Sequence, residues 1–284
     1  MNGAIVASLP LYQAVVLGIV QGLSEFLPIS SSAHLLLLPW LFAWPILRDP
    51  ALNKTFDVAL HFGTLIALFS YYARDAVGLL AAWLRSAWRR RISEPTERLA
   101  WMILITVVPA GLFGWRYEEF IEQRLGDPRL IGLLLIVFAG LLALAELVGR
   151  RRRAAEEVGL KDAIIIGCAQ ALSLFPGVSR SGITITTGLF VGLKRDAAAR
   201  FTFLMSLPII AGAALFKAAH LATHGMPHGM GLPFAAGVIA SALSGYAAVA
   251  FLIRYLQART VYPFVWYRIV VGLGVLGLWV ARAH

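Results

Sequence analysis

The stretch GIVQGLSEFLPISSS, residues 18–32, is matched later in the chain by GCAQALSLFPGVSRS, residues 167–181. Aligned without gaps, the two segments share seven of fifteen residues at one constant offset. The identities are Gly18/Gly167, Gln21/Gln170, Leu23/Leu172, Ser24/Ser173, Phe26/Phe175, Ser30/Ser179 and Ser32/Ser181. This agreement predicts a chain built by duplication.

The rest of the sequence has the composition of a membrane protein. Hydrophobic residues make up 59% of the 284 residues and charged residues only 14%, which is typical of an all-α integral membrane protein. At about 1.5 Å of rise per residue, six apolar runs are long enough to cross the bilayer core. These runs are Val58–Ala73, Leu99–Trp115, Leu130–Gly149, Phe201–Phe216, Leu232–Ile253 and Thr260–Ala281. We therefore expect one polytopic domain over residues 1–284.

Two stretches do not fit as spans, namely residues 10–47 and 161–194. Each consists of two apolar segments broken by Pro, Gly and Ser, and each segment is too short to cross the bilayer. Such pairs are typical of re-entrant hairpins in inverted repeats. Three spans follow each hairpin, and an odd number of crossings inverts the second half. The sequence thus predicts an inverted-topology repeat, with repeat one over about 10–149 and repeat two over about 161–282, whose hairpin tips meet in a polar chamber inside the bilayer.

The net charge of +10 is concentrated in alternate loops. Basic residues gather in short segments at 85–98, 150–161, 194–200 and 254–259. Cytoplasmic loops carry such an excess of Lys and Arg, so these loops are expected on the cytoplasmic side. The basic residues are then explained by topology and lipid headgroups, and no nucleic-acid partner is expected. Hairpin one opens outward and hairpin two toward the cytoplasm.

The hairpin tips have the composition of an anion site. Ser30 and Ser179 are placed as N-caps of the second helix in each hairpin. Both helices would then direct backbone N–H groups into the chamber, where the helix dipole favours an anion. Arg180 adds a permanent charge with a fork suited to phosphate oxygens, beside the hydroxyls of Ser181 and Thr184. The expected ligand is a phosphate group.

The first hairpin carries groups for chemistry. Gln21 and Glu25 are four residues apart and share one helix face. Ser31 and His34 are three apart, so they are a candidate nucleophile and base. Glu25 either holds a divalent cation or orients His34. Together with the anion site, these groups suffice for phosphoryl transfer.

Three further polar residues lie inside apolar runs. His61, one turn after Asp57, is expected either to support the site or to pack as an ordinary core residue. Arg268 and Glu146 are expected to be structural or to extend toward the membrane surface.

The motifs QGLSEFLPISSSAH (21–34) and FPGVSRSGIT (175–184) resemble those of the bacterial undecaprenyl-diphosphate phosphatase family, also called the bacitracin-resistance family. Its first signature, Glu or Gln, three residues, then Glu, is met by Gln21 and Glu25. Its second, PGxSRSxxT, is met from Pro176 to Thr184. The resemblance covers nearly the whole chain, including RFTFLMSLPIIAGA (200–213). It implies removal of one phosphate from a C55 isoprenoid diphosphate at the outer face of the bacterial cytoplasmic (inner) membrane, with Mg or Ca, to recycle the lipid carrier for cell-wall synthesis.

The family's functional positions fall on residues that the motifs already single out. The resemblance implies catalytic roles for Glu25, Ser31, His34 and Arg180, with Glu25 also as a metal ligand. It implies substrate-binding roles for Gln21, Ser30, Gly177, Ser179, Ser181 and Thr184. Two departures are the neutral Gln21 in the first motif and Ser32-Ala33 in place of a commoner Thr-Gly.

Other functions remain to be weighed against this one. Inverted repeats with broken helices are also the architecture of secondary transporters and flippases, so transport of phosphate or of a polyprenyl phosphate lipid is the alternative. Lipid phosphatases of the acid-phosphatase type need a histidine and an aspartate downstream of their Ser-Arg motif. The residues after Arg180 read SGITITTGLF and contain neither, which excludes that class. The sequence carries no signal for an oligomeric state.

Overall fold

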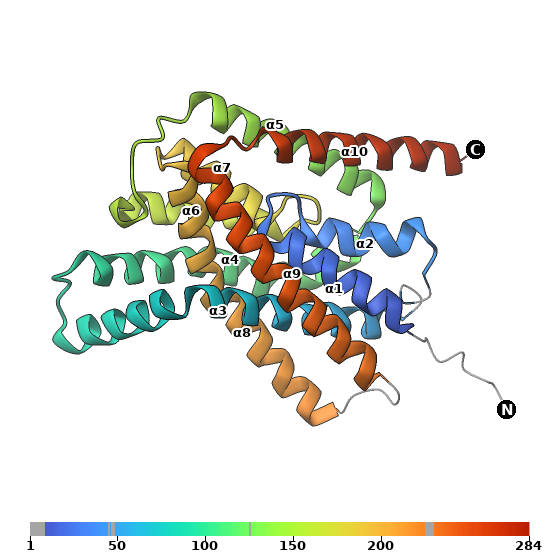
Figure 1. The fold of residues 1–284 in the computed structure, drawn as a ribbon, viewed down its shortest axis with the longest axis horizontal. Coiled ribbons are helices and arrows are strands. Elements are labelled where there is room, and N and C mark those ends of the chain that lie inside the picture. The colour runs from blue at the N-terminus through green and yellow to red at the C-terminus, as the bar shows by residue number, and fades with distance from the viewer. Residues whose placement is uncertain (1–8, 45, 47–48, 125, 225–229, 284) are drawn as a thin grey trace.

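A computed structural model describes residues 9–44, 46, 49–124, 126–224 and 230–283 (Figure 1). Within these residues the regular elements are helices, and the strand-like pairing is limited to an isolated bridge between Arg153 and Leu193. The predicted all-α class is confirmed. The helices are α1 (Leu11–Phe26), α2 (Ser31–Leu41), α3 (Pro50–Arg89), α4 (Pro95–Arg124), α5 (Pro128–Val148), α6 (Leu160–Ala171), α7 (Arg180–Phe190), α8 (Arg195–His224), α9 (Gly231–Ala258) and α10 (Tyr262–Ala283), with short 3-10 helices η2 (Ala155–Glu157) and η3 (Leu172–Leu174).

Five helices within the described residues are long and apolar enough to cross a membrane. They cover Leu52–Arg89, Pro95–Tyr117, Pro128–Val148, Gly231–Ala258 and Tyr262–Arg282. Five of the six predicted spans coincide with these ranges, except that Gly149 and residues 260–261 lie just outside them. The sixth, 201–216, lies in α8, where the side chains from residue 213 onward fall outside the described part of the chain. The protein is a multi-pass membrane protein.

Helix α3 is much longer than the predicted span of 58–73. It runs for 40 residues, and its backbone leaves helical geometry at Tyr72 (φ −107°, ψ 23°). Asp75, just beyond this kink, pairs with Arg200 of α8 at 2.8 Å. Asp75 ends the apolar run but does not end helix α3, because Arg200 of α8 neutralises its charge.

Each interrupted stretch folds as two short helices joined by an irregular turn. In the first, α1 and α2 flank residues 27–30, and in the second, α6 with η3 and α7 flank residues 175–179. Helices α2 and α7 both have 11 residues and begin at matching positions of the sequence repeat. The two hairpins are thus alike in length and in the position of their breaks.

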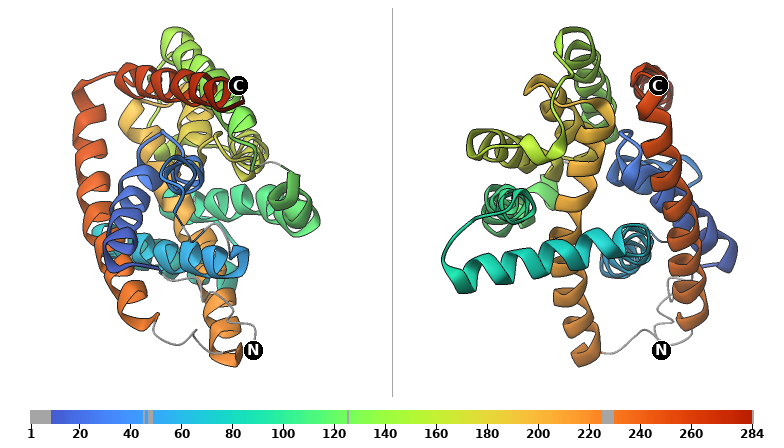
Figure 2. Two further views of the ribbon diagram at one scale, coloured as in Figure 1. Left: turned by 90° about the vertical axis from the view of Figure 1, so that its right-hand side faces the viewer. Right: turned by 60° about the vertical axis from the view of Figure 1, so that its left-hand side comes forward.

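The helices of the two halves pack reciprocally. α1 lies along α9, α6 lies along α4, and α5 lies along α10 (Figures 1 and 2). Glycines permit the close approach: a Cβ on Gly18 would lie 2.4 Å from the carbonyl oxygen of Gly237, and one on its matched residue Gly167 would lie 2.8 Å from that of Thr106. A two-fold relation between duplicated halves would produce this exchange. The inverted orientation itself stays a prediction.

Candidate functional site

The second helix of each hairpin begins at a serine cap. The Ser30 hydroxyl accepts a hydrogen bond from the Ala33 N–H at 3.4 Å, and the Ser179 hydroxyl accepts one from the Gly182 N–H at 3.0 Å. Both predicted N-caps are confirmed. Both serines also have a positive φ, +78° and +74°, which is unfavourable for a residue with a Cβ and is retained where the surroundings over-determine it.

The two hairpin tips are in direct contact. The Gly177 N–H donates to the Ser30 hydroxyl at 3.2 Å, and the Ser181 hydroxyl donates to the Leu27 carbonyl at 3.0 Å. Each cap serine also hydrogen-bonds the serine two residues later, Ser30 with Ser32 at 3.3 Å and Ser179 with Ser181 at 3.2 Å. The predicted meeting of the tips is confirmed. These hydroxyls build the frame of the site.

Arg268 of α10 hydrogen-bonds the irregular turns of both hairpins. Its side chain is fully buried and donates to the Pro28 carbonyl at 3.4 Å, the Gly177 carbonyl at 2.8 Å and the Leu135 carbonyl at 3.2 Å. The expectation of a structural role is confirmed, but this arginine does not extend to the membrane surface. Each of its three guanidinium nitrogens donates to one of these carbonyls, which lowers the cost of burying the charge.

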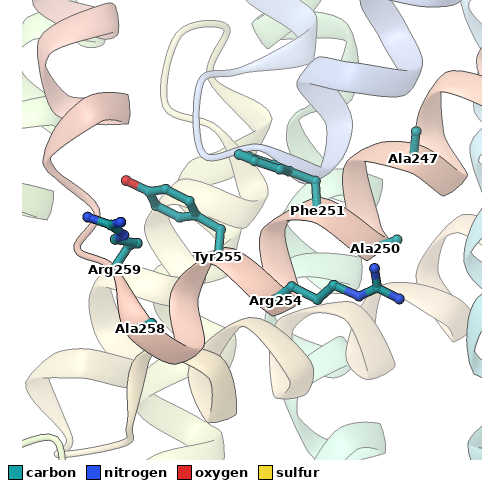
Figure 3. A pocket seen from close by; sticks show the side chains of 7 residues that line it. All are labelled: Ala247, Ala250, Phe251, Arg254, Tyr255, Ala258 and Arg259. Carbon is teal, nitrogen blue, oxygen red and sulfur yellow. The ribbon is translucent and has the colours of Figure 1, made fainter.

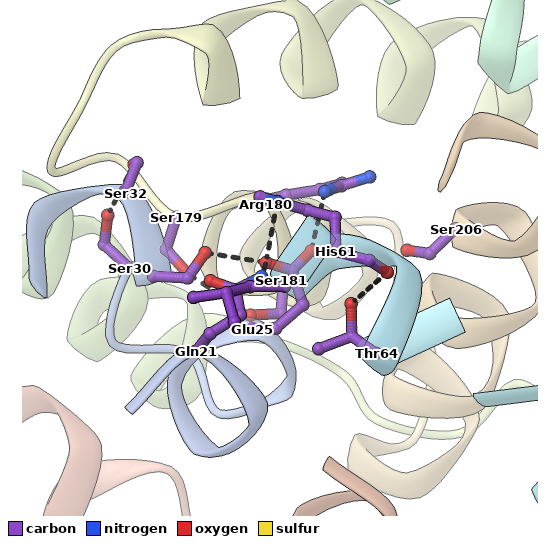
Figure 4. Close-up of polar contacts among 12 residues, drawn as sticks. Gln21, Glu25, Ser30, Ser32, His61, Thr64, Ser179, Arg180, Ser181 and Ser206 are labelled. Atoms are coloured by element: carbon purple, nitrogen blue, oxygen red, sulfur yellow. Dashed lines mark hydrogen bonds and ion pairs between the residues drawn. The ribbon is translucent and has the colours of Figure 1, made fainter. Parts of the chain in front are cut away.

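Glu25 is the centre of the polar contacts (Figure 4). It accepts hydrogen bonds from the Arg180 guanidinium at 2.6 Å, the Ser31 hydroxyl at 2.7 Å and the Gln21 amide at 3.1 Å. The His61 Nε2 lies 3.5 Å from the same carboxylate, so of the two expectations for His61 the structure favours support of the site. A single carboxylate, almost fully buried, thus joins both hairpins and α3.

Arg180 has guanidinium N–H groups that make no hydrogen bond within the described residues. Only one guanidinium nitrogen is hydrogen-bonded within the described part of the chain, and that bond goes to Glu25. The Arg180 side chain is 20% exposed. Below it, the Thr184 hydroxyl donates to the Arg180 carbonyl at 2.7 Å and accepts from Thr202 of α8 at 2.9 Å. The remaining guanidinium N–H groups are available to an anion at the N-terminus of α7.

His34 differs from the expectation. Its Nδ1 lies 2.7 Å from the Ser30 carbonyl and its Nε2 lies 2.7 Å from the Tyr267 hydroxyl. It makes no hydrogen bond with Ser31 or Glu25, so the expected serine–histidine pair and the expected orientation of His34 by Glu25 are both wrong for this structure. The Ser30 backbone carbonyl, four residues before His34, accepts the imidazole hydrogen bond in place of the Ser31 side chain.

The tautomer of His34 follows from these partners. A carbonyl oxygen can only accept, so Nδ1 carries the hydrogen. In the neutral ring Nε2 then accepts from the Tyr267 O–H, and the two rings are nearly parallel, with centroids 5.6 Å apart and an interplanar angle of 18°. Sequence reasoning missed Tyr267 because it is one of several aromatic residues at the start of α10, where interfacial anchors are common.

Comparison with known proteins places the chain in a family. The family model described as bacitracin resistance protein BacA matches residues 14–274. The chain belongs to the BacA family. An undecaprenyl-diphosphatase of Pelobacter propionicus is 50% identical over 269 residues, covering 94% of this chain and 97% of the relative. Proteins of the same name from Geobacter metallireducens and Geobacter sulfurreducens are each 51% identical, covering 93% and 95% of this chain and 96% and 98% of those relatives.

The donor set of this BacA-family site bears on the expected divalent cation. No group of three or more His, Cys, Asp or Glu residues suited to a metal is present in the described part of the chain. Glu25 is the carboxylate at the tips, and the Gln21 Oε1 beside it is buried without a hydrogen-bond partner. Mg²⁺ is usually held by one or two carboxylates together with substrate phosphates. The site therefore fits a cation that is shared with a phosphate ligand, with Glu25 and Gln21 as its protein oxygens.

Proposed function

We propose that this protein is a membrane phosphatase that hydrolyses undecaprenyl diphosphate to undecaprenyl phosphate and inorganic phosphate. The names of the relatives that match nearly the whole chain support this activity. The observation that carries the proposal is the cluster of Glu25, Ser31 and Arg180 where the two hairpin tips meet. It combines a hydroxyl, its proton acceptor and a guanidinium with free donors.

Phosphate binding is assigned to Arg180 and the helix N-termini. The free guanidinium N–H groups and the first N–H groups of α2 and α7 converge on the tips, where they stabilise negative charge. Ser30, Gly177, Ser179, Ser181 and Thr184 have their polar groups engaged within the protein. Their proposed contribution is to hold the frame at which the terminal phosphate sits.

The chemistry is assigned to Ser31 and Glu25. Ser31 already donates its hydrogen to Glu25, so Glu25 takes this proton as the serine oxygen attacks the terminal phosphorus. The bond from that phosphorus to the bridging oxygen breaks, and the electron pair leaves with undecaprenyl phosphate. Water then cleaves the phosphoserine, which releases inorganic phosphate and returns the proton to the serine. This assignment of the base replaces the one predicted for His34.

His34 is assigned to the leaving group. Its Nδ1 is committed to the Ser30 carbonyl. In the protonated ring Nε2 also carries a hydrogen, and we assign this hydrogen to the bridging oxygen as that oxygen leaves, which returns the ring to the neutral form whose Nε2 accepts from Tyr267. Tyr267 fixes the ring in this orientation and keeps its own proton. A divalent cation held between Glu25, Gln21 and the diphosphate would neutralise part of the substrate's charge.

The proposed location follows from the family and the loop charges. The site is assigned to the outer face of the bacterial cytoplasmic membrane, where lipid carrier is released during cell-wall synthesis. No contact in the described part of the chain favours the transport alternative.

Phosphate release tests this function. Purified protein in detergent is given undecaprenyl diphosphate, and inorganic phosphate is measured for wild type, Ser31→Ala and Arg180→Ala. Ser24→Ala is the matched control, because its hydroxyl donates only to Val20 of its own helix. We expect release by wild type and the control, and loss in the other two. Folded wild type that releases no phosphate would refute the function, and near-normal release by Ser31→Ala would refute the covalent step alone.

A further inference from the structure

His61 of α3 belongs to the Glu25 cluster but takes no part in the proposed reaction (Figure 4). Its Nε2 lies 3.5 Å from Glu25 Oε2, which is longer than the roughly 2.7–3.2 Å of an N–H···O hydrogen bond. The side chain is 32% exposed, so water or a dissolved ion can reach the imidazole. His61 is therefore near the carboxylate without being hydrogen-bonded to it.

The other ring nitrogen fixes the tautomer of His61. Nδ1 lies 2.8 Å from the Asp57 backbone carbonyl, which can only accept, so Nδ1 carries the hydrogen. In the neutral ring, Nε2 then directs a lone pair at a carboxylate oxygen that also can only accept. Two such atoms repel each other unless a positive ion lies between them, and their separation is too long for a shared proton. A histidine whose other N–H donates to a backbone carbonyl is typical of metal ligands.

The separation of the two atoms suits ligands of one divalent cation. Bonds of about 2.0–2.2 Å from a metal to nitrogen and oxygen place neighbouring ligands about 3.0–3.5 Å apart. The Gln21 amide nitrogen lies 3.1 Å from the same Glu25 Oε2. Half a turn of this amide brings its Oε1, which is buried without a hydrogen-bond partner among the described residues, to the same place. Oε2 then accepts from Ser31 with one lone pair and binds the cation with the other.

The packing of α3 holds His61 in this position. Ser241 of α9 donates to the Leu60 carbonyl at 2.8 Å. A Cβ on Gly63 would lie 2.5 Å from the Val238 carbonyl oxygen, so α3 and α9 are in close contact on both sides of His61 in the sequence. A ligand on a rigid, packed helix keeps its geometry before the ion binds.

The distribution of charge favours the hairpin tips over the open pocket on α9. That pocket is lined by Arg254 and Arg259 and has no acidic residue or histidine in its lining (Figure 3), and two guanidinium groups repel a cation. At the tips, Arg180 is bound to Oε1 of Glu25, whereas His61 lies beside Oε2. The guanidinium and a cation therefore do not compete for one oxygen.

We propose that His61 is a ligand of the divalent cation, through Nε2, together with Glu25 and Gln21. This inference rests on the cation of the proposed function and adds its nitrogen ligand. Ca²⁺ takes oxygen ligands, whereas first-row transition ions also accept imidazole, so the site prefers Mn²⁺ to Ca²⁺. His34 is not a ligand, because its Nδ1 donates to a carbonyl and its Nε2 accepts from Tyr267.

Binding of Mn²⁺ alone, without substrate, tests the assignment. Purified protein in detergent is titrated with Mn²⁺, and electron paramagnetic resonance of the free ion gives the dissociation constant. Pulsed spectra of the bound ion report a directly coordinated nitrogen. We expect this nitrogen signal in wild type and its loss in His61→Ala, with affinity at least about tenfold lower. The matched control His34→Ala should keep the signal and bind Mn²⁺ within about threefold of wild type.

A second variant changes the type of ligand. His61→Asp offers an oxygen in place of the nitrogen, so it should lack the nitrogen signal, retain bound Mn²⁺ and shift the preference toward Ca²⁺ by about tenfold or more. A wild type that binds no Mn²⁺ or shows no nitrogen signal would overturn the assignment, as would a nitrogen signal that persists in both His61 variants. Wild type that shows the signal but releases no phosphate would refute the proposed function and leave the ligand assigned.

Discussion

Replacing Tyr267 with phenylalanine removes one atom from the hydrogen-bonded environment of His34. The phenylalanine ring can stay stacked over the imidazole, and the bond from Nδ1 to the Ser30 carbonyl is untouched. What is lost is the donor 2.7 Å from Nε2. A single hydrogen bond of this kind contributes about 1 kcal/mol, so a fivefold to tenfold loss of kcat is expected.

The Michaelis constant should hardly change in Tyr267→Phe. His34 is assigned to the leaving group, whereas Arg180 and the helix N-termini hold the phosphate, so removing the phenol affects the transition state more than ground-state binding. The assay is phosphate release from undecaprenyl diphosphate as a function of substrate concentration and pH. Tyr246→Phe is the control, because its ring packs on Tyr71 and lies on another helix.

A double-mutant cycle separates positioning from a general structural role. If Tyr267 acts through His34, the loss of kcat seen in Tyr267→Phe disappears in a His34→Gln background. A loss of the same size in both backgrounds, or no loss in the wild-type background, would refute the reasoning. A rise in KM with kcat unchanged would place Tyr267 in substrate binding instead.

Three further outcomes follow from the same geometry. Arg180→Ala leaves Glu25 buried without its charge partner, which costs about 3–5 kcal/mol of stability in comparable pairs, and it should lower kcat/KM at least 10³-fold. Thermal unfolding in detergent measures the first effect and phosphate release the second. Arg180→Lys should retain more stability than activity. Glu25→Gln leaves an amide oxygen that can accept the Ser31 hydrogen bond but cannot take its proton, so kcat should fall by about 10²–10⁴-fold. A chelator should inhibit wild type, and inhibition that excess Mg²⁺ does not reverse would count against the shared cation. Gly22→Ala should lower the unfolding temperature, because its Cβ would lie 2.5 Å from the backbone carbonyl oxygen of Ser241 as well as 2.0 Å from the Ser244 hydroxyl. Gly78→Ala, with nothing within 4 Å, should not.

Features with a local cause could be predicted from the sequence. Ser30 and Ser179 cap their helices because each follows a Pro-containing break and precedes an apolar run, and these signals lie within a few residues. The spans follow from length and hydropathy alone. The contact between the tips was predicted from the repeat and the number of crossings, which limit how two hairpins can be placed.

Features that depend on distant partners could not be predicted in this way. Tyr267 is 233 residues from His34 in sequence, and nothing near it distinguishes it from an interfacial aromatic residue. Arg268 was expected to be structural, but the three carbonyls that accept its hydrogen bonds come from three different segments. The spacing of Ser31 and His34 allowed a contact, but spacing does not show that a backbone carbonyl one turn away is the better acceptor.

The matched segments at the two tips share a frame but not their chemistry. Two of the identical pairs pack or cap: Gly18 and Gly167 lie against other helices, and Ser30 and Ser179 cap α2 and α7. Gln21, which is matched by Gln170, is an identical position beside Glu25. The reactive groups fall where the segments differ, because Glu25 is matched by Leu174 and Ser31 by Arg180. One tip therefore supplies the nucleophile and its base, and the other supplies the charge that holds phosphate. Since Arg180 reaches Glu25, at 2.6 Å, only across the contact between the tips, neither half of the chain contains the site by itself.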